Sequence, residues 1–404
     1  MARIATFTAL SYPNYRLWFM GQLASLVGTW MQGTAQGYLI FELTRSPVYL
    51  GYIGFAGGLP TWLFILWAGV IADNMPRRTL LVITQSVMMM LAFILAGLTG
   101  MGIVQPWHIV VLSFLLGIAN AFDAPARQAF VLEMVEREDL DNAIALNAAM
   151  FNSAGAIGPA VAGITYAALG PFWCFTINGL SFIAVIAALL AMRLKPFQPP
   201  PQRPSPFSAL KEGLSYVRSN FPIRTVIIMI GVITLLVNGY GTLIPAWAVD
   251  ILKGDSATNG YLQSARGLGA LIGALVLASL GRFRAKGRLL TLGAFLFPLM
   301  IVLFSQVNRL WLSLLILVGV GWGSMWLFNN ANALVQTHSP NGLRGRIISV
   351  YTLVFFGMMP LSSLLAGTLA DAIGLTTTVL LTALVALVFA LGIYIAAPSI
   401  HTLK

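Results

Sequence analysis

Two residues of opposite charge, Asp123 and Arg127, lie four positions apart in a largely apolar stretch of the sequence. In a helix this spacing places both side chains on one face, where they can form an ion pair. An ionisable group inside an apolar helix costs about 2.5–3.5 kcal/mol on insertion scales and is therefore a candidate functional group by default. Two interpretations remain open: a purely structural ion pair, and a carboxylate that couples protons or conformational change to function.

Another charged residue, Arg266, lies near the middle of a second apolar stretch, between the small residues Ala265 and Gly267. An arginine at that depth needs an acceptor or water. Three alternatives remain: an ion pair with Asp250, contact with an anionic substrate, or a long side chain that reaches the water interface on the outer side of the membrane.

Uncharged polar residues form a stripe near the N-terminus, because Gln32 and Gln36 follow Gln22, Ser25 and Thr29 at helical spacing. A polar stripe in lipid must face protein or water. The stripe therefore indicates either hydrogen bonds between helices or the wall of a substrate cavity.

Aromatic and amide side chains share a second predicted face, on which Trp322, Trp326 and Asn329 are spaced by four and three residues. Asn238 and Tyr240 add a similar combination elsewhere. Aromatic faces beside amides suit a flat, amphipathic ligand. Packing or an interfacial aromatic belt is the alternative, but mid-span tryptophans fit a belt poorly, which favours a cavity.

A run of small residues, Gly155, Gly158, Pro159 and Gly163, follows one predicted helix. Glycine permits close approach between helix backbones, and proline allows the helix to bend. Helix packing is the simplest role for this run.

The elements that position these residues are predicted to be membrane-spanning helices. The chain of 404 residues is 58% hydrophobic and 9% charged, whereas soluble domains carry about 25% charged residues. A spanning helix needs about 20 apolar residues. Twelve such stretches predict an all-α polytopic membrane protein: 17–41, 48–72, 79–101, 107–131, 142–168, 172–193, 223–250, 258–281, 287–306, 309–336, 344–371 and 375–397.

A linker divides these stretches into two sets of six. Residues 196–206 contain six prolines and cannot continue a helix. We expect an N-terminal bundle at 1–195, a proline-rich and basic linker at 196–222, and a C-terminal bundle at 223–404. Glycines 51 and 58 match glycines 260 and 267 at a constant offset, which predicts pseudo-twofold symmetry between two six-helix bundles.

The net charge of +11 is a signal of topology. Of 23 Lys and Arg residues, 19 lie on the predicted inner side, including the inner ends of spans. Only Arg45, Lys253 and Arg309 lie on the outer side, and Arg266 lies near the middle of a span. Positive charge is enriched on the cytoplasmic side, so both termini are expected in the cytoplasm. This distribution argues against a nucleic-acid partner.

Several kinds of site are not expected. The sequence has no GxxxxGK[ST] phosphate-binding loop and no G-x-S-x-G nucleophile motif. Its three histidines lack metal-ligand spacing. A lone cysteine, Cys174, rules out an intrachain disulfide. We therefore expect no enzymatic activity, no cofactor and no metal, and no cleavable signal peptide is visible.

The loop GVIADNMPRRTLL resembles the signature of the major facilitator superfamily through Gly69, Asp73, Arg77 and Arg78. It departs from that signature where Asn74 replaces an arginine and a proline replaces a glycine two residues later. Residues 14–36, 122–130 and 156–163 are similar to the branch that includes the enterobactin exporters, which release a siderophore. The resemblance implies a proton-driven exporter in a bacterial inner membrane.

The resemblance also implies roles for residues. Asp73 would accept from amides of the helix beginning near Leu343, and Arg77 or Arg78 would pair with Asp123. These contacts would latch the cytoplasmic side, although both arginines could instead serve topology alone. The first, fourth, seventh and tenth spans would line the cavity, and a Gly-Pro pair on the fifth span is associated with exporters.

The sequence as a whole favours a proton-coupled exporter of a small siderophore-like or drug-like compound that works by alternating access. The alternatives are an uncoupled facilitator or importer and a non-transporting receptor or scaffold. The expected partners are a small-molecule substrate, protons and membrane lipid, and the expected state is a monomer.

Overall fold

The computed structural model describes residues 5–194, 206–279 and 286–403, and in that part of the chain every regular element is a helix. The first half contains η1 (Ala5–Ser11), α1 (Pro13–Thr44), α2 (Pro47–Asn74), α3 (Arg77–Gly100), α4 (Pro106–Phe130), η2 (Val131–Glu133), η3 (Arg137–Asp139), α5 (Leu140–Leu169) and α6 (Pro171–Ala191).

The second half contains α7 (Pro206–Ser219), α8 (Phe221–Val237), α9 (Tyr240–Ala246), η4 (Trp247–Ile251), α10 (Ser256–Ser279), α11 (Lys286–Ser305), α12 (Leu310–His338), α13 (Arg344–Ile373), α14 (Leu375–Ala396) and η5 (Pro398–Thr402). The expected all-α class is confirmed. The prolines of the predicted linker at 196–205 lie outside the described residues.

Glycine and proline set several helix boundaries. Gly170 and Gly374 have φ values of 84° and 87°, which favour glycine and end α5 and α13 before the next helix begins one residue later. Pro171 then starts α6 at the first helical position, where its missing amide hydrogen costs nothing. The predicted division between the last two spans therefore falls at Gly374.

The expected number of spans is met only in part. Ten helical segments of the described chain are long and apolar enough to cross a membrane, and α2 makes eleven if its two bent parts form one span. Helix α1 is long enough, with 32 residues, but does not pass this test. Its polar stripe lowers its mean hydropathy, which is why α1 is not counted among the clear spans.

The span that precedes α10 is interrupted. Helix α8 ends at Val237, α9 begins at Tyr240, and the π-helical segment η4 follows from Trp247. Gly239 lies at the break, where an added methyl group would meet the Ser362 carbonyl oxygen of α13 at 2.3 Å. Glycine is therefore needed for this close approach.

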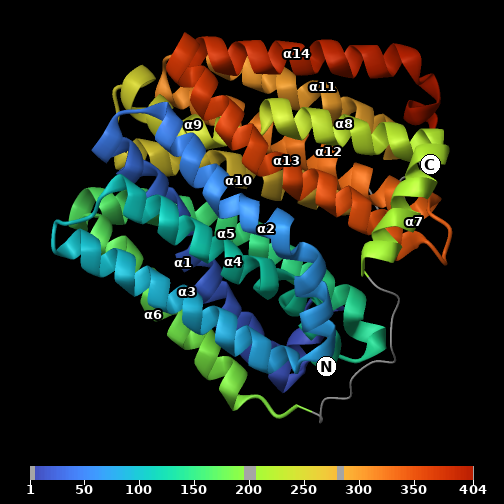
Figure 1. Cartoon of the computed structure of the whole chain (residues 1–404), viewed down its shortest axis with the longest axis horizontal. Coiled ribbons are helices and arrows are strands. Elements are labelled where there is room, and N and C mark those ends of the chain that lie inside the picture. Colours follow the sequence, from blue (N-terminus) through green and yellow to red (C-terminus); the bar gives the residue numbers. More distant parts are fainter. Residues whose placement is uncertain (1–4, 195–205, 280–285, 404) are drawn as a thin grey trace.

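Helices α1–α6 form one layer and α8–α14 form the other, and both termini lie at the same end, towards which the two layers diverge (Figure 1). We call this the termini end and the opposite end the closed end. At the closed end, Ser46 donates to Asp371 of α13 at 3.2 Å, and Ser256 of α10 donates to the Gly163 carbonyl of α5 at 3.4 Å. These bonds join the two halves.

Two glycine contacts also hold the halves together near the closed end. A methyl group added at Gly163 of α5 would lie 3.0 Å from the Cα of Gly260 on α10, and one at Gly367 of α13 would lie 2.8 Å from the Cα of Gly51 on α2. Gly51 and Gly260 are the residues that the internal repeat matched. The repeat therefore places equivalent glycines in equivalent contacts.

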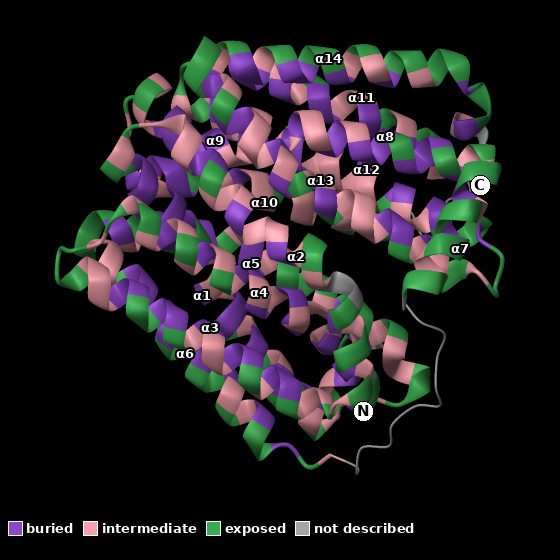
Figure 2. Cartoon of the chain, viewed as in Figure 1, coloured by how far each residue is buried: buried purple, intermediate pink, exposed green. Residues whose placement is uncertain are grey.

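The outward surface of the bundle is apolar. Large hydrophobic side chains such as Trp67, Leu315, Val388 and Ile395 are at least half exposed, and exposed residues line the outer faces of α14, α3 and α6 (Figure 2). Soluble proteins rarely expose apolar surface on this scale, whereas lipid accepts it. The surface agrees with a protein that passes the membrane many times.

Helix α7 docks on the start of α13. Glu212 forms an ion pair with Arg346, and Gly213 lies so close to α13 that an added methyl group would meet the Arg346 carbonyl oxygen at 2.5 Å. This contact anchors the segment between the two bundles to the second one.

We expect Gly213→Ala to lower the stability of the protein by about 1–3 kcal/mol, the usual cost of overpacking a tight contact. Thermal unfolding of the purified protein measures the change. Gly345→Ala is the matched control, since no atom lies within 4 Å of a methyl group there. Equal unfolding temperatures for the two variants would contradict the docking contact.

Candidate substrate and coupling site

Two adjoining cavities have volumes of about 280 and 270 Å³. The first is lined by residues of the first half and by Gln263 of α10, whereas residues of both halves line the second. They share Gly33, Asn120 and Gln263. Because α1 runs from the termini end to the closed end, the first cavity, which reaches down to Gln22, lies nearer the termini end. Together they offer the space of a typical small-molecule site, about 300–1,000 Å³.

The walls of the first cavity are mostly amides, hydroxyls and aromatic rings. Trp30 of α1 and Phe151 of α5 meet edge to face with ring centroids 5.6 Å apart. The polar lining consists of Gln22, Ser25, Thr29, Thr34, Gln85, Asn120 and Gln263, together with Asp123 and Arg127. This combination suits an amphipathic ligand with hydrogen-bonding groups.

Asp123 is the central polar group of the first cavity and is only 2% exposed. Its Oδ1 accepts hydrogen bonds of 2.9 Å from the Thr84 hydroxyl and from the Gln85 amide, both on α3. Arg127 Nε lies 3.4 Å from the Oδ2 atom. The carboxylate is thus held by two neutral donors and one cation, as buried charges require.

The pairing that we expected between Asp123 and Arg77 or Arg78 is wrong. Arg77 begins α3 at the termini end, where it pairs with Glu133 at 2.5 Å and lies 3.9 Å from Asp73. Arg78 donates to the carbonyl oxygens of residues 190 and 192 at the end of α6. Asp123 lies deeper in the bundle, beside the cavity.

These contacts of Arg77 and Arg78 all lie within the first half, so in this conformation they do not join the halves. The contact expected between Asp73 and the start of α13 stays a prediction. Gly69 has no atom within 4 Å of the position of an added methyl group.

Of the two glutamines predicted to line the cavity, only Gln36 does so. Gln36 faces the second cavity and donates to the Ser113 hydroxyl of α4 at 2.5 Å. Gln32 instead accepts a 2.6 Å hydrogen bond from Asn178 and so joins α1 to α6. Both interpretations of the polar stripe therefore apply, each to part of it.

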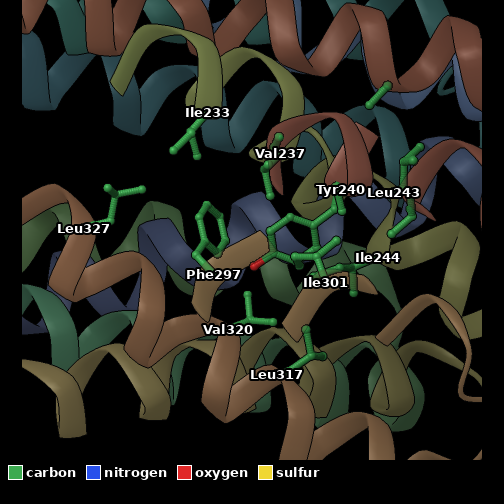
Figure 3. Close-up of a cluster of buried hydrophobic side chains, with 14 of the residues drawn as sticks. Ile233, Val237, Tyr240, Leu243, Ile244, Phe297, Ile301, Leu317, Val320 and Leu327 are labelled. Atoms are coloured by element: carbon green, nitrogen blue, oxygen red, sulfur yellow. The ribbon is translucent and has the colours of Figure 1, made fainter. Parts of the chain in front are cut away.

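The aromatic face predicted on α12 lies elsewhere. Trp322 and Trp326 pack against each other edge to face at 5.5 Å, and neither they nor Asn238 or Asn329 line either cavity. Tyr240 is buried in the apolar core of the second half, where its ring meets Phe297 at 6.2 Å (Figure 3).

Arg266 forms no ion pair with Asp250 among the described residues. Its guanidinium lies against Tyr240. A methyl group added at Gly241 would lie 2.7 Å from the Arg266 Nη1 atom, and Gly241 lines the second cavity.

The small residues of α5 serve two interfaces. Gly155 and Gly158 face Trp30 of α1, while the backbone at Gly155, Pro159 and Gly163 lies close to α10. The run therefore brings the first half close to the second.

The sequence analysis missed the cavity residues Gln85, Ser113, Asn120 and Gln263. It also missed Thr84, which donates to Asp123. Each is a polar residue within an apolar span, which is the signal that could have found it. These residues come from three helices, α3, α4 and α10, so no single motif groups them.

Comparison with known proteins gives consistent matches over the whole chain. Residues 4–402 match the family described as Transmembrane secretion effector. The chain is 25% identical to the staphyloferrin A transporter of Staphylococcus aureus, over 90% of this chain and 91% of that protein. It is 27% identical to the enterobactin exporter EntS of Escherichia coli, over 85% and 82% of the two chains.

Solved structures of transporters share the fold. A bacterial homologue of the lysosomal transporter Spinster, in an inward-facing conformation, aligns over 99% of this chain and 98% of its own with a TM-score of 0.72 and 13% identity. A POT family transporter aligns over 96% of both chains with a TM-score of 0.74 and 13% identity.

Proposed function

The chain belongs to the transmembrane secretion effector family, and on that premise we propose that it exports a small amphipathic compound in exchange for protons. It is a membrane transporter of the major facilitator type and not an enzyme. Direction, coupling and mechanism form the proposal. Its central support is Asp123, a buried carboxylate in the wall of the first cavity, which the first half lines together with Gln263 of the second half.

Asp123 can link a proton to the substrate because both would act on the same set of contacts. A proton on Asp123 removes the negative partner of Arg127 and changes the groups that Thr84 and Gln85 can bond. These side chains face the first cavity or lie directly behind its wall. In exchange transport, proton and substrate would occupy this site in turn.

Alternating access would follow from the contrast between the two ends. The closed end is held by glycine contacts and by the Ser46–Asp371 hydrogen bond. The positive residues concentrate towards the termini end, which we assign to the cytoplasm of a bacterial inner membrane. This conformation would then accept substrate from the cytoplasm and would release it after the closed end opens.

Closure of the cytoplasmic side would use the loop between α2 and α3. Asp73 lies at the end of α2, one turn after Gly69, and Arg77 and Arg78 begin α3. Their charges would contact the start of α13 once the halves approach. The cavity lies between two halves of one chain, so a monomer would be sufficient for transport. The Gly158–Pro159 pair would allow α5 to bend during the change.

Export is supported by the relatives, two of which are named as exporters of a siderophore or of several drugs: the enterobactin exporter EntS and the multidrug efflux pump Tap of Mycolicibacterium fortuitum, 28% identical over 85% of this chain. The mixed aromatic and amide lining of the cavity fits either a siderophore-like or a drug-like molecule.

Purified protein in proteoliposomes tests the proposal. With an imposed pH gradient, acidic inside, we expect accumulation of the amphipathic dye ethidium, and we expect a protonophore to abolish it. A facilitator would only equilibrate the dye, and a receptor would not move it. Dye movement that is identical with and without the gradient would overturn proton coupling.

A further inference from the structure

The two cavities carry an uneven set of charges. The only charged side chains in their linings are Asp123 and Arg127, which pair and so cancel. Arg266 lies just behind the wall of the second cavity and has no carboxylate within ion-pair distance in the described parts of the chain. Within this region Arg266 is therefore an uncompensated positive charge.

The position of Arg266 relates it to the space between the halves. It lies one turn along α10 from Gln263, which lines both cavities. Its Nη1 atom lies beside Gly241, and an added methyl group at Gly241 would come within 2.7 Å of it. Gly241 lines the second cavity, so the guanidinium lies beside a residue of that cavity's wall.

The chemistry of arginine suggests which ligand would compensate this charge. A guanidinium presents planar donors that match the two oxygens of a carboxylate or a similar flat oxyanion. The Tyr240 hydroxyl, against which Arg266 lies, is neutral and leaves the positive charge uncompensated. An arginine in the middle of a span is costly, which indicates a function that needs it.

We propose that Arg266 anchors an anionic group of the substrate, a carboxylate or a comparable oxyanion, at the second cavity. The inference rests on the proposed function only in that it takes the cavities as the substrate site. The uncharged body of the ligand would extend towards Trp30 and the amides of the first cavity.

Two probes of equal shape test this anchor, naphthoate and its neutral amide, naphthamide. Each is titrated by calorimetry into the full chain in lipid nanodiscs at neutral pH and constant ionic strength, with empty nanodiscs as the blank. We expect naphthoate to bind at least about tenfold more tightly than naphthamide, the difference that one charge-assisted pair supplies.

Variants test whether Arg266 is the source of this preference. Arg266→Gln should remove the preference for the anion and leave naphthamide binding unchanged, and Arg266→Lys should keep part of it. If Arg266→Gln fails to fold, Gly241→Ala keeps the charge but displaces the guanidinium, and it should weaken the binding of naphthoate more than that of naphthamide. Gly97→Ala is the matched control, because a methyl group there meets no atom within 4 Å.

A wild-type protein that binds both probes equally, or neither, overturns the anionic anchor, as does a preference that persists in both Arg266→Gln and Gly241→Ala. These outcomes are separate from the failure of export. If Arg266→Gln transports ethidium normally and the wild type shows no preference for the anion, the anionic anchor is wrong but proton-coupled export stands. If the wild type prefers the anion but transports nothing, the proposed export is wrong but the anionic anchor stands.

Discussion

Asp123→Asn is expected to reduce gradient-driven transport by about 10- to 100-fold, while the protein remains folded and still binds ligand. The substitution keeps the size of the side chain and one acceptor for Thr84 and Gln85, but it removes the proton site and the charge that pairs with Arg127. The magnitude follows from losing one charge-assisted interaction of about 1.5–3 kcal/mol. Ethidium accumulation in proteoliposomes measures it.

The control separates coupling from general damage. Asp141→Asn removes a carboxylate from the exposed start of α5 and should leave transport unchanged. Ethidium counterflow without a gradient should persist in Asp123→Asn, because the halves can still exchange the substrate. Normal gradient-driven transport in Asp123→Asn would remove this carboxylate from the coupling mechanism.

The second large effect is expected from a cross-link at the closed end. Ser46 and Asp371 lie on opposite halves and are hydrogen-bonded at 3.2 Å. In a Cys174→Ala background, Ser46→Cys with Asp371→Cys should form a disulfide that prevents the closed end from opening. Oxidation should then abolish ethidium transport, and a reductant should restore it.

Two single variants control this experiment. Ser46→Cys alone and Asp371→Cys alone remove the hydrogen bond but cannot form the disulfide, so oxidation should leave their transport unaffected. Full transport through the cross-linked double variant, with the disulfide verified by mass spectrometry, would show that the closed end need not open and would contradict transport by alternating access.

Much of the fold could be predicted because lipid restricts what a chain can do. Every backbone polar group must be satisfied within the membrane, so long apolar stretches become helices. Gly170 and Gly374 divided adjacent helices where few polar residues marked a turn. The polar stripe of α1 lowered its hydropathy, and α2 is bent, which is why the count of clear spans is ten or eleven rather than twelve.

The site was less predictable because sequence spacing fixes only which residues share a helix face. The spacing of Asp123 and Arg127 was enough to predict their ion pair, because both residues lie on one helix. Spacing could not show which face of a helix points to the cavities. Gln32 was therefore expected at a cavity but bonds Asn178, and Trp322 was expected there but packs on Trp326. Arg77 begins α3, whereas its partner Glu133 lies just after α4, so spacing within one helix could not predict this pair.

The most direct test of proton-coupled export is the proton movement that substrate itself triggers. Inside-out vesicles with an acidified lumen contain a pH-sensitive dye, and ethidium is added outside to wild-type protein and to Asp123→Asn. We predict that ethidium causes protons to leave the lumen in the wild type and not in the variant. Ethidium uptake into the wild-type vesicles without any proton release would contradict it.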